Sequence, residues 1–482
     1  MPLILGTNSI KDTGYNVANS CRFNEADSPD LSRATGETTG ATQWTFSAWI
    51  KRSTLGSLDN GGTFMGWYSA TNKRSIFGFN DDDKLYWWSD NGSGTQGDAT
   101  TAAVFRDVGA WYHVVLKIDT PQSDQANRVK IFVNNVEQTL TFSGSHPAQN
   151  EANTGMYGKS IIGASYYNTG TDRHFGGYLA EVCLIDDSAL SPSSFAEADE
   201  DSPTIWKPKD VSGLTFGSDG AYLDFEDSGD LDDDESGNGN DYTATNLAAT
   251  DQCVDSPTNN FATANPLNVN SGGVSTFAEG NTEVTVNGAS GMQFGSSSTL
   301  GMTAGKWYCE VKIKTVDSGL IGVSAGASED ARDDYPPGTQ GGAESVGILC
   351  SSGNRYIDDS GATHGAATSA DGIMMIALDL DNNNVYFGTG GNWFDGSGNA
   401  DESSPNSAIS VTAVGSTTEG AYFFSFGDGG GSSACKVQWN FGNPPYANSS
   451  SQSDANGYGD FEYSVPSGYL ALCTKNLGSD GG

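Results

Sequence analysis

Short runs in which apolar and polar residues alternate recur along most of the chain. Residues 44–51 place Phe46, Ala48 and Ile50 on one face, and residues 306–314 repeat the pattern. A period of two residues predicts a half-buried β-strand. Further strands are predicted at 76–79, 84–88, 111–119, 128–133, 136–140, 160–163, 177–185, 221–225, 320–323, 345–350, 371–380, 385–387, 421–426 and 437–441. No long helical period accompanies them, so we expect an all-β protein.

The predicted strands fall into two groups, each large enough to bury a core of its own. The 63 glycines of the 482-residue chain supply many turns between the strands. The acidic, Gly-rich and Asn-rich residues between the groups are expected to form an extended connector that contains a strand. The predicted boundaries are 1–204 for a first β-sandwich, 205–265 for the connector, 266–475 for a second β-sandwich and 476–482 for a flexible tail.

The charge balance limits the partners of the chain. It carries 60 acidic and 23 basic residues, a formal net charge of −37. Nucleic acids are bound through clustered Lys and Arg, so a nucleic-acid partner is not expected. No stretch approaches the length of a transmembrane helix, and the first ten residues do not resemble a signal peptide. We therefore expect no membrane insertion, and synthesis in a cytoplasm followed by release through assembly or lysis.

The order of several motifs resembles two known families. WTFSAWIK, GAWYHVVLKID and RVKIFVNNVEQ, closed by SIIGAS and GGYLAEVCLIDDSALSPSSF, resemble a laminin G-like module of the concanavalin A type. GKWYCEVKI, GLIGVS, SVGILC and ADGIMMIALDLDNNNVYFG resemble a SPRY module. These resemblances imply a concanavalin A-like sandwich followed by a SPRY-like sandwich.

The combination of the two modules resembles bacteriophage tail-fibre and virion surface proteins. The resemblance implies a virion structural protein, at the surface or tail of the particle, made in the host cytoplasm. It also implies other virion proteins and host-surface polysaccharide as partners, and a homo-oligomer, with a trimer favoured. A purely architectural role, as a capsid decoration or tail subunit, remains an alternative.

A second alternative is a polysaccharide depolymerase. Glycosidases of the concanavalin A-like clan carry Glu-x-Asp-x-Glu on one strand, which sets two carboxylates across a sugar bond. No such triplet lies on a predicted strand here, and Glu181 stands alone in LAEVCLID. The sequence therefore predicts a protein that is not an enzyme.

Three clusters have the composition of a carbohydrate site, in which rings stack on the apolar face of a sugar and polar groups bind its hydroxyls. Two adjacent tryptophans cannot both face the core of a strand, so one of Trp87 and Trp88 is expected to point outward. Packing under a loop, or an interface with another subunit, is the alternative for each cluster. The clusters are Tyr86, Trp87, Trp88, Asp90 and Asn91; Tyr166, Tyr167 and Asp172; and Trp393 and Phe394.

Metal chemistry is predicted at one place at most. The seven cysteines are scattered singly without a CxxC pair, which argues against zinc. The connector offers a dense supply of the carboxylates that calcium prefers. The candidate calcium ligands are Asp227, Asp230, Asp232 and Asp234, and no other cofactor is expected.

Overall fold

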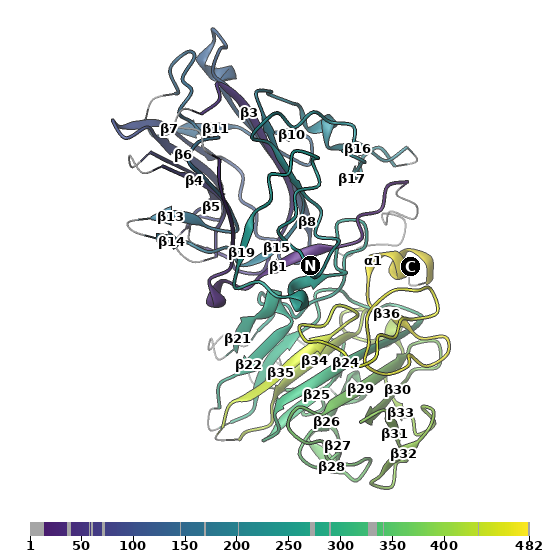
Figure 1. Cartoon of the computed structure of the whole chain (residues 1–482). Helices are drawn as coiled ribbons and strands as arrows, with labels where there is room; N and C mark the ends of the chain where they lie inside the picture. The colour runs from purple at the N-terminus through teal and green to yellow at the C-terminus, as the bar shows by residue number, and fades with distance from the viewer. Residues whose placement is uncertain are drawn as a thin grey trace. The chain divides into compact units, whose positions relative to one another are not determined.

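The computed structural model describes residues 14–35, 40–56, 58, 61–69, 73–144, 146–167, 170–200, 202–269, 275–288, 291–325, 335–340, 342–431 and 433–480. The chain forms two compact units, Asp12–Thr258 and Asn259–Gly482, here called the first and the second unit. Each is built from β-sheets (Figure 1) whose strands are antiparallel except for the parallel pair β24–β36 in the second unit. No helix of the described residues is long and apolar enough to cross a membrane. The all-β, two-sandwich class predicted from the sequence is confirmed.

Two sheets form the sandwich of the first unit. The convex sheet, as we call it, has the strand order β10 (Val136–Glu137), β9 (Val129–Val133), β8 (Trp111–Asp119), β3 (Gln43–Arg52), β15 (Gly177–Asp186), β1 (Ser20–Phe23) and β20 (Gln252–Cys253), and β18 (Ala221–Leu223) also pairs with β15. The groove sheet has the order β11 (Leu140–Phe142), β7 (Thr95–Thr101), β6 (Leu85–Asp90), β5 (Arg74–Phe79), β4 (Thr63–Tyr68), β12 (Lys159–Ile162), β2 (Asp30–Ala34) and β19 (Thr243–Thr245). The small hairpins are β13 (Ser165–Tyr167) with β14 (Gly170–Asp172), and β16 (Ala196–Ala198) with β17 (Trp206–Pro208).

The core of the first unit lies between these two sheets. Alternate residues of β3, among them Phe46 and Ile50, meet Phe64 and Phe77 of the groove sheet in one buried apolar cluster. Phe64 and Phe77 pack edge to face, with ring centroids 4.9 Å apart. The period-two pattern of the sequence therefore marks the side of each strand that faces the other sheet.

The outer side of the convex sheet is also buried. Val115, Cys183 and Ile185 point away from the sandwich core and pack against Phe195 and residues 211–222. Trp49 joins a second outer cluster with Trp111, Tyr178 and Cys253. A sheet that is buried on both faces needs strands that are mostly apolar, which explains why apolar residues occupy both faces of β15 on either side of Glu181.

Residues 205–265, which the sequence predicts to be an extended connector, contribute strands to the first sandwich. Within them β18 pairs with β15, β19 with β2 and β20 with β1, so that most of the segment completes the first sandwich. The physical reason is the apolar outer side of the convex sheet, which this segment covers. The compact unit accordingly ends at Thr258 rather than near residue 204.

A buried ion pair fixes the end of this segment to the first sandwich. Lys51 Nζ of β3 lies 2.7 Å from Asp255 Oδ2, and both side chains are at most 1% exposed. Trp111 Nε1 donates a hydrogen bond to the other oxygen of Asp255 at 3.1 Å. Each buried charge thus has a partner, which a buried charge requires.

The second unit is another pair of sheets. One has the order β21 (Ser275–Ala278), β22 (Glu283–Val286), β35 (Cys435–Asn440), β24 (Lys306–Thr315), β29 (Ile373–Asp379), β30 (Asn384–Thr389), β31 (Asn392–Phe394) and β32 (Ala400–Glu402), with β33 (Ile409–Ser410) beside β30 and β36 (Leu470–Ala471) beside β24. The other has the order β23 (Gln293–Ser297), β34 (Phe423–Asp428), β25 (Gly319–Ser324), β26 (Ser345–Leu349), β27 (Arg355–Ile357) and β28 (Ser360–Ala362). Helix α1 (Thr474–Asp480) follows β36, where the sequence places the start of a flexible tail.

A buried carboxyl group ties the late part of the second unit to β24. Glu310 is fully buried, and its oxygens accept hydrogen bonds from Tyr308 Oη (2.9 Å) and Asn440 Nδ2 (3.2 Å). The backbone N–H groups of Glu462 and Tyr463 donate to it as well, at 2.9 and 2.8 Å. Four donors on one side chain explain why a glutamate can occupy a fully buried position in the middle of β24.

Candidate functional site

The outer face of the groove sheet carries a hollow of about 780 Å³, here called the sheet groove. Its wall is formed by β5, β6 and β7, the turn after β5 and Arg173. The volume falls within the range of small-molecule sites. The side chains used below are Arg74, Tyr86, Trp88, Asp98, Thr100 and Ser143.

Strand β6 supplies the aromatic surface of the sheet groove. Its residues alternate, so that Leu85 and Trp87 enter the core while Tyr86 and Trp88 face the groove and are half-buried. Trp87 is completely buried, and its Nε1 donates to Ser75 Oγ at 3.1 Å. Of the two adjacent tryptophans, Trp88 is therefore available to a ligand and Trp87 is a core residue.

Polar groups of neighbouring strands stand beside these rings. Asp98 and Thr100 of β7 lie across from Trp88 and Tyr86 in the strand pairing. Ser143 Oγ donates a hydrogen bond to Asp98 Oδ2, which fixes the carboxylate at the edge of the sheet. Carboxylate and hydroxyl oxygens accept and donate the hydrogen bonds that sugar hydroxyls make.

Two arginines add positive charge to the sheet groove. The Arg74 guanidinium lies 5.0 Å from the centroid of the Trp88 ring, a cation–π geometry. Burial raises the pKa of Tyr86 to about 12, with a further rise from Asp98 and an opposing effect of Arg173. The Tyr86 hydroxyl is therefore neutral at physiological pH and can both donate and accept a hydrogen bond.

The second predicted cluster lies on the hairpin β13–β14, which borders the same sheet face. Tyr166 stacks on Tyr68 of β4, with centroids 3.7 Å apart. Gly66 of β4 permits this approach, because a Cβ there would lie 2.9 Å from the Cα of Ser165. Asp172 is exposed and its Oδ1 accepts from the backbone of Arg173, while the side chain of Tyr167 lies outside the described residues.

The remaining members of the first cluster shape the turn after β6. Asp90 Oδ1 accepts from the backbone N–H of Gly92 at 2.7 Å, and Asn91 Oδ1 from that of Ser93 at 2.9 Å. Such contacts from Asx side chains are typical of tight turns. Neither residue is among those that line the sheet groove.

The third predicted cluster, in the second unit, is buried. Trp393 is 4% exposed and Phe394 1%. Phe394 belongs to the apolar core of the unit, and Trp393 packs near Tyr308 with centroids 6.3 Å apart. The sequence predicts a loop with exposed rings here, whereas the structure has strand β31, and the two rings pack inside the unit.

The acidic tract expected to hold calcium uses most of its carboxylates locally. Asp234 accepts from the backbone N–H groups of Tyr222, Ser236 and Asn240. Asp232 Oδ2 accepts from the backbone of Ala244, and Asp227 Oδ1 from that of Gly229. A hydrogen bond with Asp232 raises the pKa of Asp230. Among the described residues no group of three or more His, Cys, Asp or Glu side chains could hold a metal ion, and calcium here stays a prediction.

The residues missed by sequence reasoning are those of β7 and the two arginines. The β7 sequence TQGDATT contains no large apolar residue, so its alternation is invisible in a hydrophobicity pattern. The alternation nevertheless exists, because Gly97, Ala99 and Thr101 are buried while Asp98 and Thr100 face the groove. The available signal was the set of small residues at alternate positions of β7, which leave room for the large Trp87 ring. Gly97 lies directly against that ring.

Comparison with known proteins identifies the fold of the first unit. Residues 26–194 match the model of the Concanavalin A-like lectin/glucanases superfamily. No curated protein matches the chain. Similar solved structures include a SAP-like pentraxin from Limulus polyphemus (16% identity, 37% of this chain and 80% of that one, TM-score 0.28). Others are the SPRY domain of human HERC1 (16%, 36% and 96%, 0.27) and domain 4 of an extracellular arabinanase from Geobacillus stearothermophilus in complex with arabinotriose (18%, 32% and 65%, 0.22).

Proposed function

We propose that the first unit binds glycans through the sheet groove, without covalent chemistry. The observation that carries the proposal is the pair of outward rings on β6, Tyr86 and Trp88, beside Asp98 and Ser143 in one hollow. The match of residues 26–194 to a superfamily of lectins and glucanases supports the same ligand class. Of the three clusters predicted from the sequence, the first therefore supplies the site, through two of its five members.

The chemistry of the sheet groove fits a sugar ring better than an apolar ligand. Tyr86 and Trp88 offer ring surface to the C–H face of a sugar, while the Asp98 carboxylate and the Thr100 hydroxyl offer hydrogen-bonding groups within the same hollow. Arg74, which lies over the Trp88 ring, adds N–H donors at the rim. A sugar needs both kinds of surface, and the aliphatic side chains that line the hollow are Leu58 and Ile76.

The test is binding of the purified protein to an array of microbial and host-surface glycans, compared with the Trp88→Ala variant. We expect saturable binding that weakens at least about tenfold in the variant, the effect of losing roughly 1.4 kcal/mol of stacking. Tyr386→Ala is the matched control, because Tyr386 is a half-buried ring on a strand of the second unit and is not among the residues that line the groove. Binding that is equal in wild type and Trp88→Ala would refute the proposal.

A reducing-end assay on the glycans that the protein binds tests the depolymerase alternative. A glucanase would release new reducing ends from any polysaccharide that it binds, whereas a lectin leaves the polymer intact. We expect no release, since glycoside hydrolysis needs two carboxyl groups placed across the bond. Release that is lost with Asp98→Asn would turn the groove into an active site.

We also propose that the protein is a surface or tail component of a phage virion, active as a homotrimer. The order of a laminin G-like and a SPRY-like module in the sequence supports this setting. Sedimentation should give three times the 50.4 kDa chain mass, and antibodies against the protein should label purified particles. Labelled particles combined with an absence of glycan binding would leave the architectural role.

A further inference from the structure

The first unit contains a second hollow, at the edge of its sandwich, that the proposed function does not use. This edge pocket, of about 590 Å³, lies where the chain leaves β10 in the convex sheet and enters β11 in the groove sheet. The sequence predicts a single strand over 136–140, whereas the structure divides it between the two sheets. The crossing at Gln138 and Thr139 forms one wall of the pocket.

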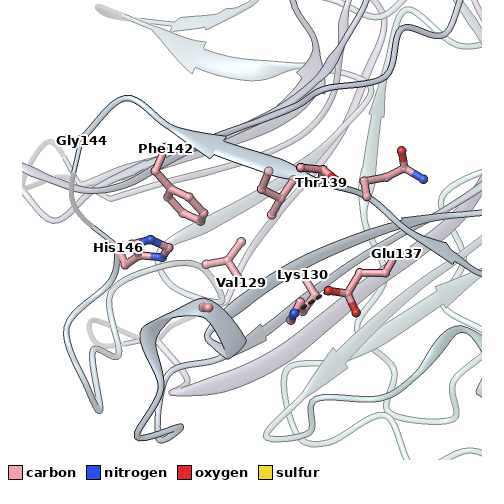
Figure 2. Close-up of a pocket in the computed structure, with 10 residues that line it drawn as sticks. Val129, Lys130, Glu137, Thr139, Phe142, Gly144 and His146 are labelled. Carbon is pink, nitrogen blue, oxygen red and sulfur yellow. Dashed lines mark hydrogen bonds and ion pairs between the residues drawn. The ribbon is translucent and has the colours of Figure 1, made fainter.

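The edge pocket has an aromatic end and a polar end. Figure 2 shows Phe142 and His146 together on one side, Val129 near the middle, and Lys130 with Glu137 on the other side. The Phe142 and His146 rings are stacked, with centroids 3.7 Å apart and an angle of 30° between their planes. A ligand that fits must therefore carry an apolar face and polar groups on one small body.

The polar end of the edge pocket is charge-balanced. Lys130 Nζ and Glu137 Oε1 lie 2.5 Å apart, so each ion already has its counter-charge. At the other end, burial and the charge of Arg128 lower the pKa of His146. The ring is thus neutral at physiological pH. Its Nδ1 is buried without a hydrogen-bond partner, and burying a protonated, charged nitrogen there would cost free energy.

The edge pocket is lined by one cation and one anion, although the chain carries a net charge of −37. Such a lining gives an ion no electrostatic advantage over a neutral ligand. A ligand class with an apolar face and many hydrogen-bonding groups is a neutral sugar. Its C–H face can lie against the Phe142–His146 pair, and its hydroxyls can reach Lys130, Glu137 and Gln138.

The pocket and the sheet groove lie on opposite faces of one edge strand. In β11, Leu140 and Phe142 line the edge pocket, and Phe142 pairs with the core residue Ala99. The intervening Thr141 pairs with Thr100, which faces the sheet groove, and Ser143 lines the groove as well. A single polymer that passes over β11 can therefore contact both hollows.

We propose that the edge pocket is a second carbohydrate site, which takes a neutral sugar residue of the glycan that the sheet groove binds. The ligand class rests on the proposed function of the first unit, but the residues are separate from those of the groove. Two sites on one chain raise the affinity for a polymer above that for its repeating unit, because the second contact is intramolecular.

The test follows the imidazole resonances of protein labelled with ¹³C at histidine, during titration with neutral oligosaccharides of glucose, galactose, mannose, xylose or arabinose. The chain has four histidines, of which His113 is completely enclosed and serves as the internal reference for an intact fold. We expect the His146 resonance to move and that of His113 to stay. The Trp88→Ala variant should keep the His146 response to short oligosaccharides.

Variants at Phe142 supply the specific control. Phe142→Leu keeps apolar contact with the core but removes the stacked ring. It should raise the dissociation constant obtained from the His146 titration about tenfold, as expected for the loss of one ring contact. Phe142→Tyr should preserve it. A silent His146 with every oligosaccharide, or an unchanged response in Phe142→Leu, would overturn the second site.

The two proposals can fail separately. If Trp88→Ala abolishes glycan binding while His146 never responds, the sheet groove is the glycan site and the edge pocket is not. If His146 responds although Trp88→Ala leaves array binding unchanged, the edge pocket binds sugar and the function proposed for the groove is wrong.

Discussion

Glu181 is the most strongly perturbed carboxyl group of the first unit, and its surroundings explain why. It lies in a bulge of β15, between Ala180 and Cys183, with a positive φ of 51°. Its Oε2 accepts hydrogen bonds from Tyr222 Oη (2.9 Å) and Tyr15 Oη (3.2 Å). Burial raises its pKa from 4.5 to about 7, against the effect of the two hydroxyl donors. Glu181 lines neither hollow, and its hydrogen bonds connect β15 to Tyr222 and Tyr15.

The raised pKa predicts a pH-dependent stability. Between pH 4.5 and about 7 the folded state holds a proton that the unfolded state releases. The contribution of Glu181 is therefore complete below pH 4.5 and is lost as the pH rises through 7. Over that window we expect wild type to lose about 3 kcal/mol relative to Glu181→Gln, whose amide does not titrate. Calorimetry of both proteins at pH 5 and pH 8 measures the difference, and parallel pH profiles would contradict it.

His113 shows the opposite shift for the same physical reason. It is enclosed in the convex sheet, where Ser47 Oγ lies 2.9 Å from Nε2 and Trp206 Nε1 donates to Nδ1. Burial lowers its pKa to about 3, so the ring is neutral when folded. A depressed histidine pKa stabilises the folded state above pH 6.5 and costs stability as the pH falls below it. His113→Gln should thus flatten the acid limb of the stability profile, which denaturation between pH 4 and pH 7 can follow.

At the scale of strands, alternation was enough to locate most of the sandwich and part of the groove. The predicted runs at 44–51, 84–88 and 177–185 correspond to β3, β6 and β15. A strand with apolar residues on both faces, such as β15, indicates that the outer face of its sheet is covered. Alternation also requires one of Trp87 and Trp88 to face outward. Alternation does not reveal which of the two tryptophans faces outward, because that depends on the register of β6 against β5 and β7.

The segment that covers the convex sheet was hidden by its composition. Residues 205–258 contain many Asp, Gly and Asn residues, which favour a solvated linker when each is taken alone. The few apolar members, including Val211, Phe216 and Tyr222, are spread too thinly to form a periodic pattern, yet all three are buried. Their role depends on contacts with strands far away in the sequence, which local pattern cannot show.

Truncation tests whether this segment belongs to the first sandwich. A chain ending at residue 258 should fold cooperatively, whereas one ending at residue 204 should expose Val115, Cys183 and Ile185 on the uncovered sheet. We expect the shorter chain to bind a hydrophobic dye and to lack a sharp unfolding transition. Equal cooperativity of the two chains would show that the segment is only a linker.

The buried pair of Lys51 and Asp255 gives a finer test of the same anchor. Asp255→Ala leaves the Lys51 ammonium buried without its carboxylate and should cost about 3–5 kcal/mol. The double variant Lys51→Met with Asp255→Leu removes both charges and should recover most of that loss, because the buried ion pair itself contributes little net stability. Urea denaturation of the three proteins decides; a double variant as unstable as Asp255→Ala would point instead to lost packing around Trp111.

For the whole molecule, the net charge of −37 opposes the compact state, since like charges repel wherever they lie within about a Debye length. Sodium chloride screens this repulsion, so the unfolding temperature should rise between low and physiological salt. Calcium chloride at matched ionic strength separates screening from binding. If the unfolding temperature depends on ionic strength in the same way in both salts, screening alone is at work. An additional, saturable rise that Asp230→Asn and Asp232→Asn remove would assign a calcium ion to the tract at 227–234, because only a site with defined ligands saturates. Tyr386→Ala, which leaves every carboxylate in place, should follow wild type in both salts, and a calcium effect equal in all variants would place the ion elsewhere.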